Sequence, residues 1–189
     1  MAVKELPQTV VPNPAFRKQV DQLGGHKVSA CFQCEKCTNG CPVAFSMDIV
    51  PHKLMRSVVL GLKDQVLKSD TIWVCASCET CTTRCPNGID IAHVMDNLRQ
   101  LAQREGVKTA QTNVPLFHST FLDSVKSRGR VAETELLVKY TLKSEGIKGL
   151  LRQAGIGLQM FKRGKIPLFS RSYSTRRVKE IFSAAERKG

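Results

Sequence analysis

The chain has 189 residues, with 29 lysines and arginines against 16 aspartates and glutamates, so its formal net charge is +13. This length predicts one domain, or one domain with an extension, and a hydrophobic content of 42% supports a real core. No run of about 18 apolar residues occurs, which excludes a membrane-spanning helix. The first residues contain no apolar signal-peptide region, so we expect a reducing, cytoplasmic location.

The basic residues are concentrated in the second half of the chain. Residues 1–105 carry 12 basic and 10 acidic side chains, whereas residues 106–189 carry 17 and 6. Nucleic acid, anionic lipid and acidic protein partners all suit such a surface. The basic residues are dispersed among apolar helical stripes without a nucleic-acid motif, which favours docking on acidic protein subunits. A solvated face remains the alternative for many of them.

Along the chain, residues 1–24 predict an extended arm and a short helix that Asn13-Pro14 begins and Gly24-Gly25 ends. After the first group of cysteines, Met47-Asp48 predicts a helix start, and a brief second helix reaches about residue 68. Ser69-Asp70 then predicts the start of a helix that carries Trp73 and Cys75. Asp90 predicts the start of a longer helix, whose apolar face is Ile91, Val94, Met95, Leu98 and Leu101.

Two copies of one motif contain all eight cysteines. In each copy three cysteines are separated by two residues, and a fourth follows after three more residues, directly before a proline. Three thiolates at this spacing hold three irons of a [4Fe–4S] cubane, and the fourth reaches a neighbouring cluster. We therefore predict two [4Fe–4S] clusters with crossed ligand sets: Cys31, Cys34, Cys37 and Cys85 for cluster 1, and Cys75, Cys78, Cys81 and Cys41 for cluster 2.

Two other uses of the cysteines fit less well. Zinc sites usually take two separated cysteine pairs, and cysteines two residues apart are badly placed to form disulfides. Eight thiolates also make histidine ligands unnecessary, which applies to His26, His52, His93 and His118. Within the motifs, Lys36 and Arg84 either raise the cluster potentials or are solvated charges. Trp73 either shields a cluster or, as we favour, packs in the core.

The chain contains an internal repeat. A cysteine motif, a proline, an Asp-Ile pair and an amphipathic helix occur twice, and the second motif begins 44 residues after the first (75 minus 31). The intervening pattern is helical, and no alternating strand pattern is visible. We therefore predict an all-α fold, with an α-helical ferredoxin-type domain at residues 25–105 after the arm and short helix at 1–24.

Residues 106–189 predict a helical, basic C-terminal extension for subunit docking. Its apolar periodicity predicts helices at 115–126, 133–143 and 147–162, and a last helix that starts at Ser174 or Thr175. The whole chain contains no dinucleotide or phosphate-binding loop and no pairing of a nucleophile with a base. The sequence therefore predicts an electron-carrying subunit without a catalytic residue of its own.

The residues around the cysteines make the pattern more specific. The run from Ile72 to Pro86 and the run from Asp48 to Arg56 resemble the C subunits of heterodisulfide reductases and their bacterial relatives. Similar matches follow later in the chain, at Phe117-His118, Phe121, Gly129-Arg130, Glu135-Leu136-Leu137, Tyr140 and Gly164-Lys165. The resemblance extends over most of the chain from about residue 25.

This resemblance implies a soluble complex, which we expect to dimerise. Its A subunit, with flavin and iron–sulfur clusters, would supply electrons, and its catalytic B subunit would reduce a disulfide. The paired-cysteine motif that marks the B subunit is missing here, in agreement with a relay role. One alternative is the iron–sulfur subunit of another anaerobic dehydrogenase or reductase complex. The other is a nucleic-acid-binding protein with structural clusters, whose binding would depend steeply on salt.

Overall fold

The computed structural model describes residues 12–25, 27–109, 111–165 and 175–188, which form helices and turns without a β-strand. These residues divide into two compact units between Gln111 and Thr112. The all-α prediction is therefore confirmed. Most of the N-terminal arm expected from the sequence, residues 1–11, lies outside the described residues.

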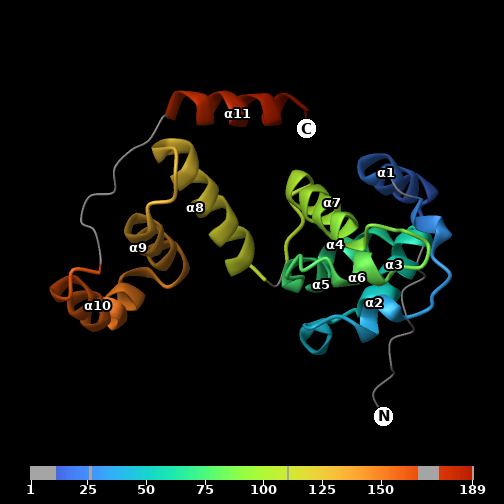
Figure 1. Ribbon diagram of the computed structural model, residues 1–189, viewed down its shortest axis with the longest axis horizontal. Helices are drawn as coiled ribbons and strands as arrows, with labels where there is room; N and C mark the ends of the chain where they lie inside the picture. The colour runs from blue at the N-terminus through green and yellow to red at the C-terminus, as the bar shows by residue number, and fades with distance from the viewer. Residues whose placement is uncertain (1–11, 26, 110, 166–174, 189) are drawn as a thin grey trace, which may run out of the picture. The chain divides into compact units, whose positions relative to one another are not determined.

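The first unit is built around its longest helix, α7, which packs against α1, α4, α5 and α6 (Figure 1). The short helices α2 and α6, which carry the third cysteines of the two motifs, also pack against each other. The helices of this unit are α1 (Pro14–Gly24), α2 (Lys36–Asn39), α3 (Pro51–Val59), α4 (Lys63–Lys68), α5 (Thr71–Val74), α6 (Thr80–Arg84) and α7 (Ile91–Arg104). Two 3-10 turns, Val28–Ala30 and Ala44–Ser46, complete it.

The apolar face predicted for α7 is the centre of the core. Its five members are each at most 3% exposed: Ile91, Val94, Met95, Leu98 and Leu101. Leu54 and Val58 of α3 and Phe16 and Val20 of α1 are equally buried. Burial of each large apolar side chain contributes roughly 1.5–3 kcal/mol to the stability of the fold. This shared burial holds both halves of the repeat in one core around α7.

Two of the predicted helix starts are confirmed. The Asn13 side chain accepts hydrogen bonds from the amides of Ala15 and Phe16 at the start of α1. The Asp90 carboxylate accepts one from the amide of His93 at 2.9 Å and so begins α7. These three bonds satisfy amides that have no partner within the helix.

The helix start predicted at Met47-Asp48 is wrong, because α3 begins at Pro51. A residue before proline is pushed to extended backbone, and Val50 has φ −61° and ψ 152°. The Asp48 carboxylate instead crosses to the start of α5. It accepts hydrogen bonds from the Ser69 hydroxyl at 2.8 Å and from the Thr71 hydroxyl and amide at 2.7 and 3.0 Å.

Gly61, which follows α3, is in contact with Asn13 at the start of α1. Its backbone has φ +75°, and its carbonyl accepts a hydrogen bond from the Asn13 amide at 3.0 Å. A Cβ atom at this position would lie 2.3 Å from the Asn13 carbonyl oxygen. Both the left-handed backbone and the close approach therefore require glycine.

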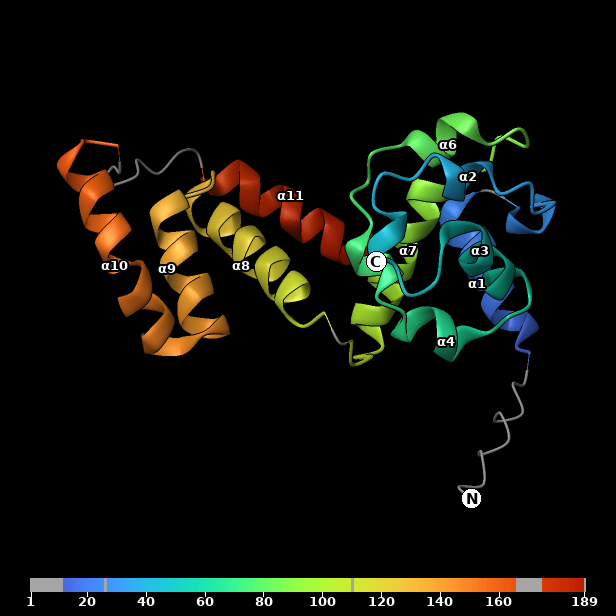
Figure 2. The same ribbon diagram turned by 90° about the horizontal axis from the view of Figure 1, so that it is seen from below.

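The described residues of the second unit form four helices: α8 (Asn113–Arg128), α9 (Glu133–Ser144), α10 (Gly146–Lys162) and α11 (Thr175–Lys188). α9 packs against α8 and α10, and α11 packs against α8 (Figure 2). Phe117 of α8 meets Tyr140 of α9 edge to face at 5.5 Å between ring centroids. The Lys126 ammonium of α8 bonds Glu186 of α11 at 2.8 Å and lies over the Phe182 ring. The helices predicted here are confirmed, apart from one or two residues at their ends.

Helix α10 exposes most of its apolar side chains. Among its residues only Gly149 is buried, whereas Ile147, Leu151 and Ile156 are 68%, 69% and 66% exposed. Large exposed apolar patches on folded proteins mark sites of interaction. In the described parts of the chain, no helix has the length and apolar character needed to cross a membrane.

Candidate metal centre

The two cysteine loops have the same backbone conformation. Gln33 and Glu35 in the first loop have φ 61° and 63°, and Ser77 and Glu79 in the second have φ 50° and 61°. The matching residues are again 44 positions apart (77 minus 33, 79 minus 35). Left-handed backbone at a residue other than glycine costs roughly 1–2 kcal/mol. Two loops that both adopt it twice indicate a fixed conformation that surrounds a bound group.

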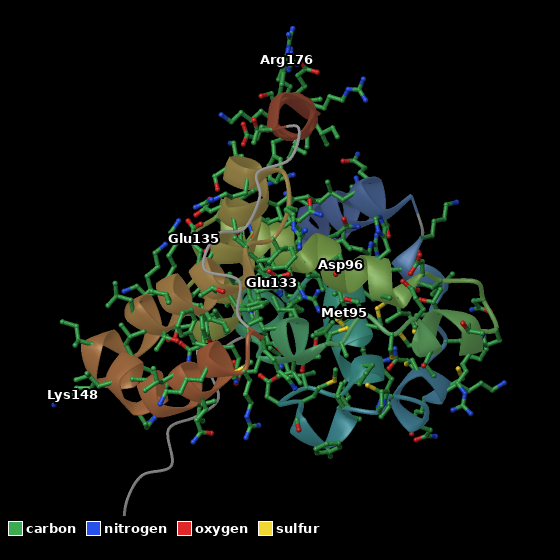
Figure 3. The ribbon with its side chains drawn as sticks, turned by 60° about the vertical axis from the view of Figure 1, so that its left-hand side comes forward. Met95, Asp96, Glu133, Glu135, Lys148 and Arg176 are labelled. Atoms are coloured by element: carbon green, nitrogen blue, oxygen red, sulfur yellow. The ribbon has the colours of Figure 1, made fainter. Side chains whose placement is uncertain are left out.

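One ligand set predicted from the motif meets in a single cavity. Cys75, Cys78 and Cys81 of the second motif line this cavity together with Cys41 of the first. The remaining lining is mostly apolar and includes Val43, Met47, Pro51, Ala92 and Met95. Figure 3 labels Met95 on α7. The structure thus brings a cysteine of the first motif to the three leading cysteines of the second.

The other predicted set is Cys31, Cys34, Cys37 and Cys85. The Asn87 side chain, two residues after Cys85, donates a hydrogen bond to the carbonyl of Ala30, directly before Cys31. The Cys85 sulfur accepts a hydrogen bond from the Ile89 amide at 3.4 Å, and the Cys31 sulfur accepts one from Gln33 Nε2 at 3.1 Å. The bond from Asn87 ties the segment after the last cysteine to the start of the first motif, whereas each of the two bonds to sulfur lies within one half of the repeat.

The thiols differ in how readily they lose a proton. Burial raises the pKa of Cys37, and burial together with the neighbouring Cys75 raises the pKa of Cys81 to about 11. A hydrogen bond between Cys78 and the Thr80 hydroxyl at 3.4 Å lowers the pKa of Cys78. Iron binds thiolates, so ligation must displace the protons of Cys37 and Cys81, whose pKa values are raised.

The residues present fit [4Fe–4S] clusters. All eight cysteines are free thiols, and thiolates are the ligands that such clusters take. Among the described residues, no three cysteine, histidine or acidic side chains converge as a site for one metal ion. A cubane does not need that convergence, because each thiolate binds its own iron. The αL positions and the shared cavity of Cys41 and Cys75 therefore suit a cluster.

The structure also shows the surroundings of the other residues that the sequence singled out. Trp73 is 5% exposed in α5, and its indole Nε1 has no hydrogen-bond partner among the described residues. His52 Nδ1 bonds the Thr38 hydroxyl at 2.8 Å, and its Nε2 lies 3.5 Å from Glu35. Lys36 is exposed at the start of α2. His26 lies outside the described residues.

Arg84 lies against the first cysteine motif. A Cβ atom at Gly40 would be 2.5 Å from Arg84 Nη1. Arg84 therefore adjoins the residue before Cys41, while it directly precedes Cys85 in the chain. Its side chain is exposed, so water screens its charge.

The sequence analysis did not identify Arg99, a residue of α7 whose side chain hydrogen-bonds to the second cysteine loop. Its guanidinium donates hydrogen bonds to the Cys75 carbonyl at 2.5 Å, to the Ser77 hydroxyl at 3.2 Å and to the carbonyl of Ile72. The side chain is only 14% exposed. Arg99 lies outside both motifs, and the only indication of it in the sequence is its position on the polar face of the predicted helix α7.

Comparisons with known proteins agree with this site. The family described as "4Fe-4S dicluster domain" matches residues 30–90, which include both motifs. The iron–sulfur C subunit of CoB–CoM heterodisulfide reductase from Methanopyrus kandleri is 42% identical over 102 residues, which are 50% of this chain and 53% of that protein. The second such C subunit of Methanocaldococcus jannaschii is 42% identical over 79 residues, 42% of each chain.

A third relative is the C subunit of the H2:CoB–CoM heterodisulfide,ferredoxin reductase of Methanothermobacter marburgensis. It is 32% identical over 91 residues, which are 48% of this chain and 49% of that protein. The chain thus spans about half the length of the curated relatives it matches. The resemblance predicted from the sequence is confirmed: residues 30–90 match the 4Fe-4S dicluster domain, and the chain is similar to the iron–sulfur C subunits of heterodisulfide reductases.

Proposed function

We propose that this chain relays electrons in a heterodisulfide reductase-like complex, and that no substrate reacts on it. It holds two [4Fe–4S] clusters, one on Cys31, Cys34, Cys37 and Cys85 and the other on Cys75, Cys78, Cys81 and Cys41. The observation that carries the proposal is the cavity that Cys41 shares with the leading cysteines of the second motif. Bound clusters supply one-electron oxidation and reduction.

The protein's own residues account for the neighbouring arrangement that a relay needs. Each loop contributes three ligands to one cluster and the fourth ligand to the other. α2 and α6 pack together, so the two loops are held side by side. Apolar residues such as Val43 and Met95 line the same cavity as Cys41, and an apolar lining limits the access of solvent and so affects the redox potential of a bound cluster.

The partners follow from the names of the relatives, which are subunits of heterodisulfide reductases. In our proposal the A subunit, with flavin and iron–sulfur clusters, donates the electrons, and the catalytic B subunit receives them and reduces a disulfide. The assembled complex dimerises and works in the cytoplasm. The lack of an evident catalytic constellation in the sequence supports a relay role for this chain.

The second unit supplies the docking surface in this proposal. A groove between α9 and α10 is lined by apolar side chains that include Leu137, Val138, Leu150 and Ile156, with Lys165 also in its lining. α10 carries three basic and no acidic residues, and one of them is Lys148 (Figure 3). The complementary occupant is an amphipathic helix of a partner protein, with carboxylates beside its apolar stripe.

Ile156→Asp tests the docking surface, and Ile181→Asp is its matched control. Both isoleucines are 66% exposed, but only Ile156 lines the groove. Tagged full-length chain, purified anaerobically with its complex, should lose the partner proteins in Ile156→Asp and keep them in Ile181→Asp. Retention of the partners in both variants would contradict the proposal. So would flotation of the wild-type chain with anionic vesicles that Ile156→Asp abolishes, because the groove would then serve a membrane.

The relay itself is tested by anaerobic purification of the chain from its native cells, with identification of every chain and cofactor that accompanies it. Co-purification of a flavoprotein and a second cysteine-rich protein would support the proposal. A different dehydrogenase as the partner would instead support the alternative iron–sulfur subunit. Recovery with nucleic acid in a salt-dependent manner would contradict both.

A further inference from the structure

The two cysteine loops share a backbone conformation, but groups of opposite charge hold them. Val28 and Ile72 occupy matching positions, each three residues before the first cysteine of its motif, and both are fully buried. The Asp21 carboxylate accepts a hydrogen bond from the Val28 amide at 2.8 Å. The Arg99 guanidinium donates one to the Ile72 carbonyl. A negative charge thus adjoins the first loop and a positive charge the second.

Arg99 is in closer contact with its loop than Asp21 is with the first. Besides Ile72, it bonds the Cys75 carbonyl and the Ser77 hydroxyl, and its side chain is 14% exposed. Its counter-charge is Asp96 on α7, at 2.8 Å from Nη1 (Figure 3). The Asp96 side chain is 45% exposed and that of Arg99 only 14%, so water weakens the field of the carboxylate more than that of the guanidinium.

Other charges near the loops do not reverse this difference. Glu35 in the first loop adds a second negative charge there, although it is 58% exposed and 3.5 Å from His52. Lys36, the next residue, carries the opposite charge, but its side chain is exposed, so water screens it. Glu79 occupies the matching position in the second loop. Arg84 adjoins Gly40 and Cys85, so it lies beside a proposed ligand of each cluster and favours neither. Arg99, which is only 14% exposed, therefore remains the main difference in charge between the two loops.

We infer that Arg99 is a positioning residue that raises the reduction potential of the cluster on Cys75, Cys78, Cys81 and Cys41 above that of the other cluster. This inference rests on the proposed relay. Adding an electron makes a cluster more negative, and a nearby buried cation stabilises that state. Electrons therefore enter at the cluster on Cys31, Cys34, Cys37 and Cys85 and leave from the second.

Each internal transfer moves one electron and no atom. Cys31, Cys34, Cys37 and Cys85 would hold the cluster that receives an electron from the flavin and iron–sulfur donor. Cys75, Cys78, Cys81 and Cys41 would hold the cluster that takes this electron over and passes it to the catalytic partner, which would be reduced. No bond forms or breaks on this chain, and the charge of Arg99 does not change.

The test is a redox titration of the full-length chain with both clusters, followed by electron paramagnetic resonance. Cys34→Ser and Cys78→Ser change the spectrum of one cluster each and so assign the two signals. Arg99→Met should lower the equilibrium constant for reduction of the second cluster by about tenfold, which is about 59 mV for one electron. Arg99→Lys should keep most of the wild-type potential, because it keeps the charge.

Two results would overturn the inference: a wild-type chain in which the first cluster has the higher potential, or an Arg99→Met variant with both potentials unchanged. Asp96→Asn covers the case in which Arg99→Met does not assemble its clusters. Loss of this counter-charge should raise the potential of the second cluster, and an unchanged value would also overturn the inference. These potentials belong to the chain alone, so a failure of the proposed partners in co-purification would leave them unaffected.

Discussion

Thr38 and Thr82 make the same contact in the two halves of the repeat. Each follows the third cysteine of its motif, and each side-chain hydroxyl accepts a hydrogen bond from the backbone amide of the second residue of the next long helix. Thr38 Oγ1 is 3.0 Å from the His52 amide of α3, and Thr82 Oγ1 is 3.2 Å from the Ala92 amide of α7. Amides at a helix start have no partner inside the helix. The threonines therefore join each cysteine loop directly to the core.

Replacing either threonine with valine should reduce stability. The loss should be about 1 kcal/mol, the usual value of a side-chain cap, and serine should restore most of it. Denaturant unfolding of the cluster-loaded chain measures the change. Thr83→Val is the control, since the Thr83 hydroxyl bonds the carbonyl of Glu79 within its own turn. An equal loss in Thr83→Val would contradict the capping role.

Gly61→Ala should destabilise the first unit strongly. The added Cβ would meet the Asn13 backbone at 2.3–2.7 Å, and φ is +75°. Gly88→Ala is a matched control, with φ +63° and no atom within 4 Å of the added Cβ. We expect roughly 1 kcal/mol for Gly88→Ala and at least about 2–3 kcal/mol for Gly61→Ala. Similar melting temperatures for the two variants would show that α1 does not pack on α3 as described.

Asp48→Asn should weaken the link between the two halves of the repeat by about 1–2 kcal/mol, since an amide cannot accept all the bonds of the carboxylate. Partial desolvation opposes ionisation, but hydrogen bonds from Thr71 and Ser69 outweigh it and hold the pKa of Asp48 below the usual 3.8. This stability is therefore present above pH 3.8 and is lost only as the pH falls through the lower folded pKa.

The deficit of Asp48→Asn should consequently stay constant between about pH 5 and 8. Thermal unfolding of wild type and variant across this range measures it. Asp64→Asn, at an exposed carboxylate in the first turn of α4, is the control and should change little. A deficit that disappears by about pH 5 would mean that the Asp48 pKa is raised in the fold.

Removal of iron should loosen the first unit and leave the second unchanged. The left-handed residues Gln33, Glu35, Ser77 and Glu79 cost energy that the bound clusters must offset. The second unit contains no cysteine. Hydrogen exchange with and without clusters should therefore differ in α2 and α6 but not in α8 and α9. Equal loss of protection in both units would show that the second unit also depends on iron.

The sequence predicted most of the helices because their apolar residues recur at helical spacing. It located α7, α9 and α10 closely, and the Asn13 and Asp90 caps as well. It failed at Asp48, because an aspartate near a proline resembles a local cap. The partners of this carboxylate, Ser69 and Thr71, are far away in the chain, and only the fold brings them to it.

The sequence likewise predicted some residues of the candidate site and not others. The motif spacing predicted all eight cysteines as ligands, and it predicted that Cys41 belongs with Cys75, whose cavity it shares in the structure. It could not identify Arg99 or Thr38, whose importance depends on which loop the fold places beside them. The exposure of Ile156 was equally hidden, since periodicity shows that a helix is apolar but not whether another helix covers it.

Spectroscopy of Cys41→Ser tests the central claim most directly. The full-length chain is purified without oxygen, its iron and sulfide are measured, and the reduced clusters are followed by electron paramagnetic resonance. We predict that Cys41→Ser loses or alters the cluster on Cys75, Cys78 and Cys81, and retains the signal assigned to the cluster on Cys31, Cys34 and Cys37. Full iron content with an unchanged spectrum, or loss of the first cluster alone, would contradict the crossed ligand sets on which the relay depends.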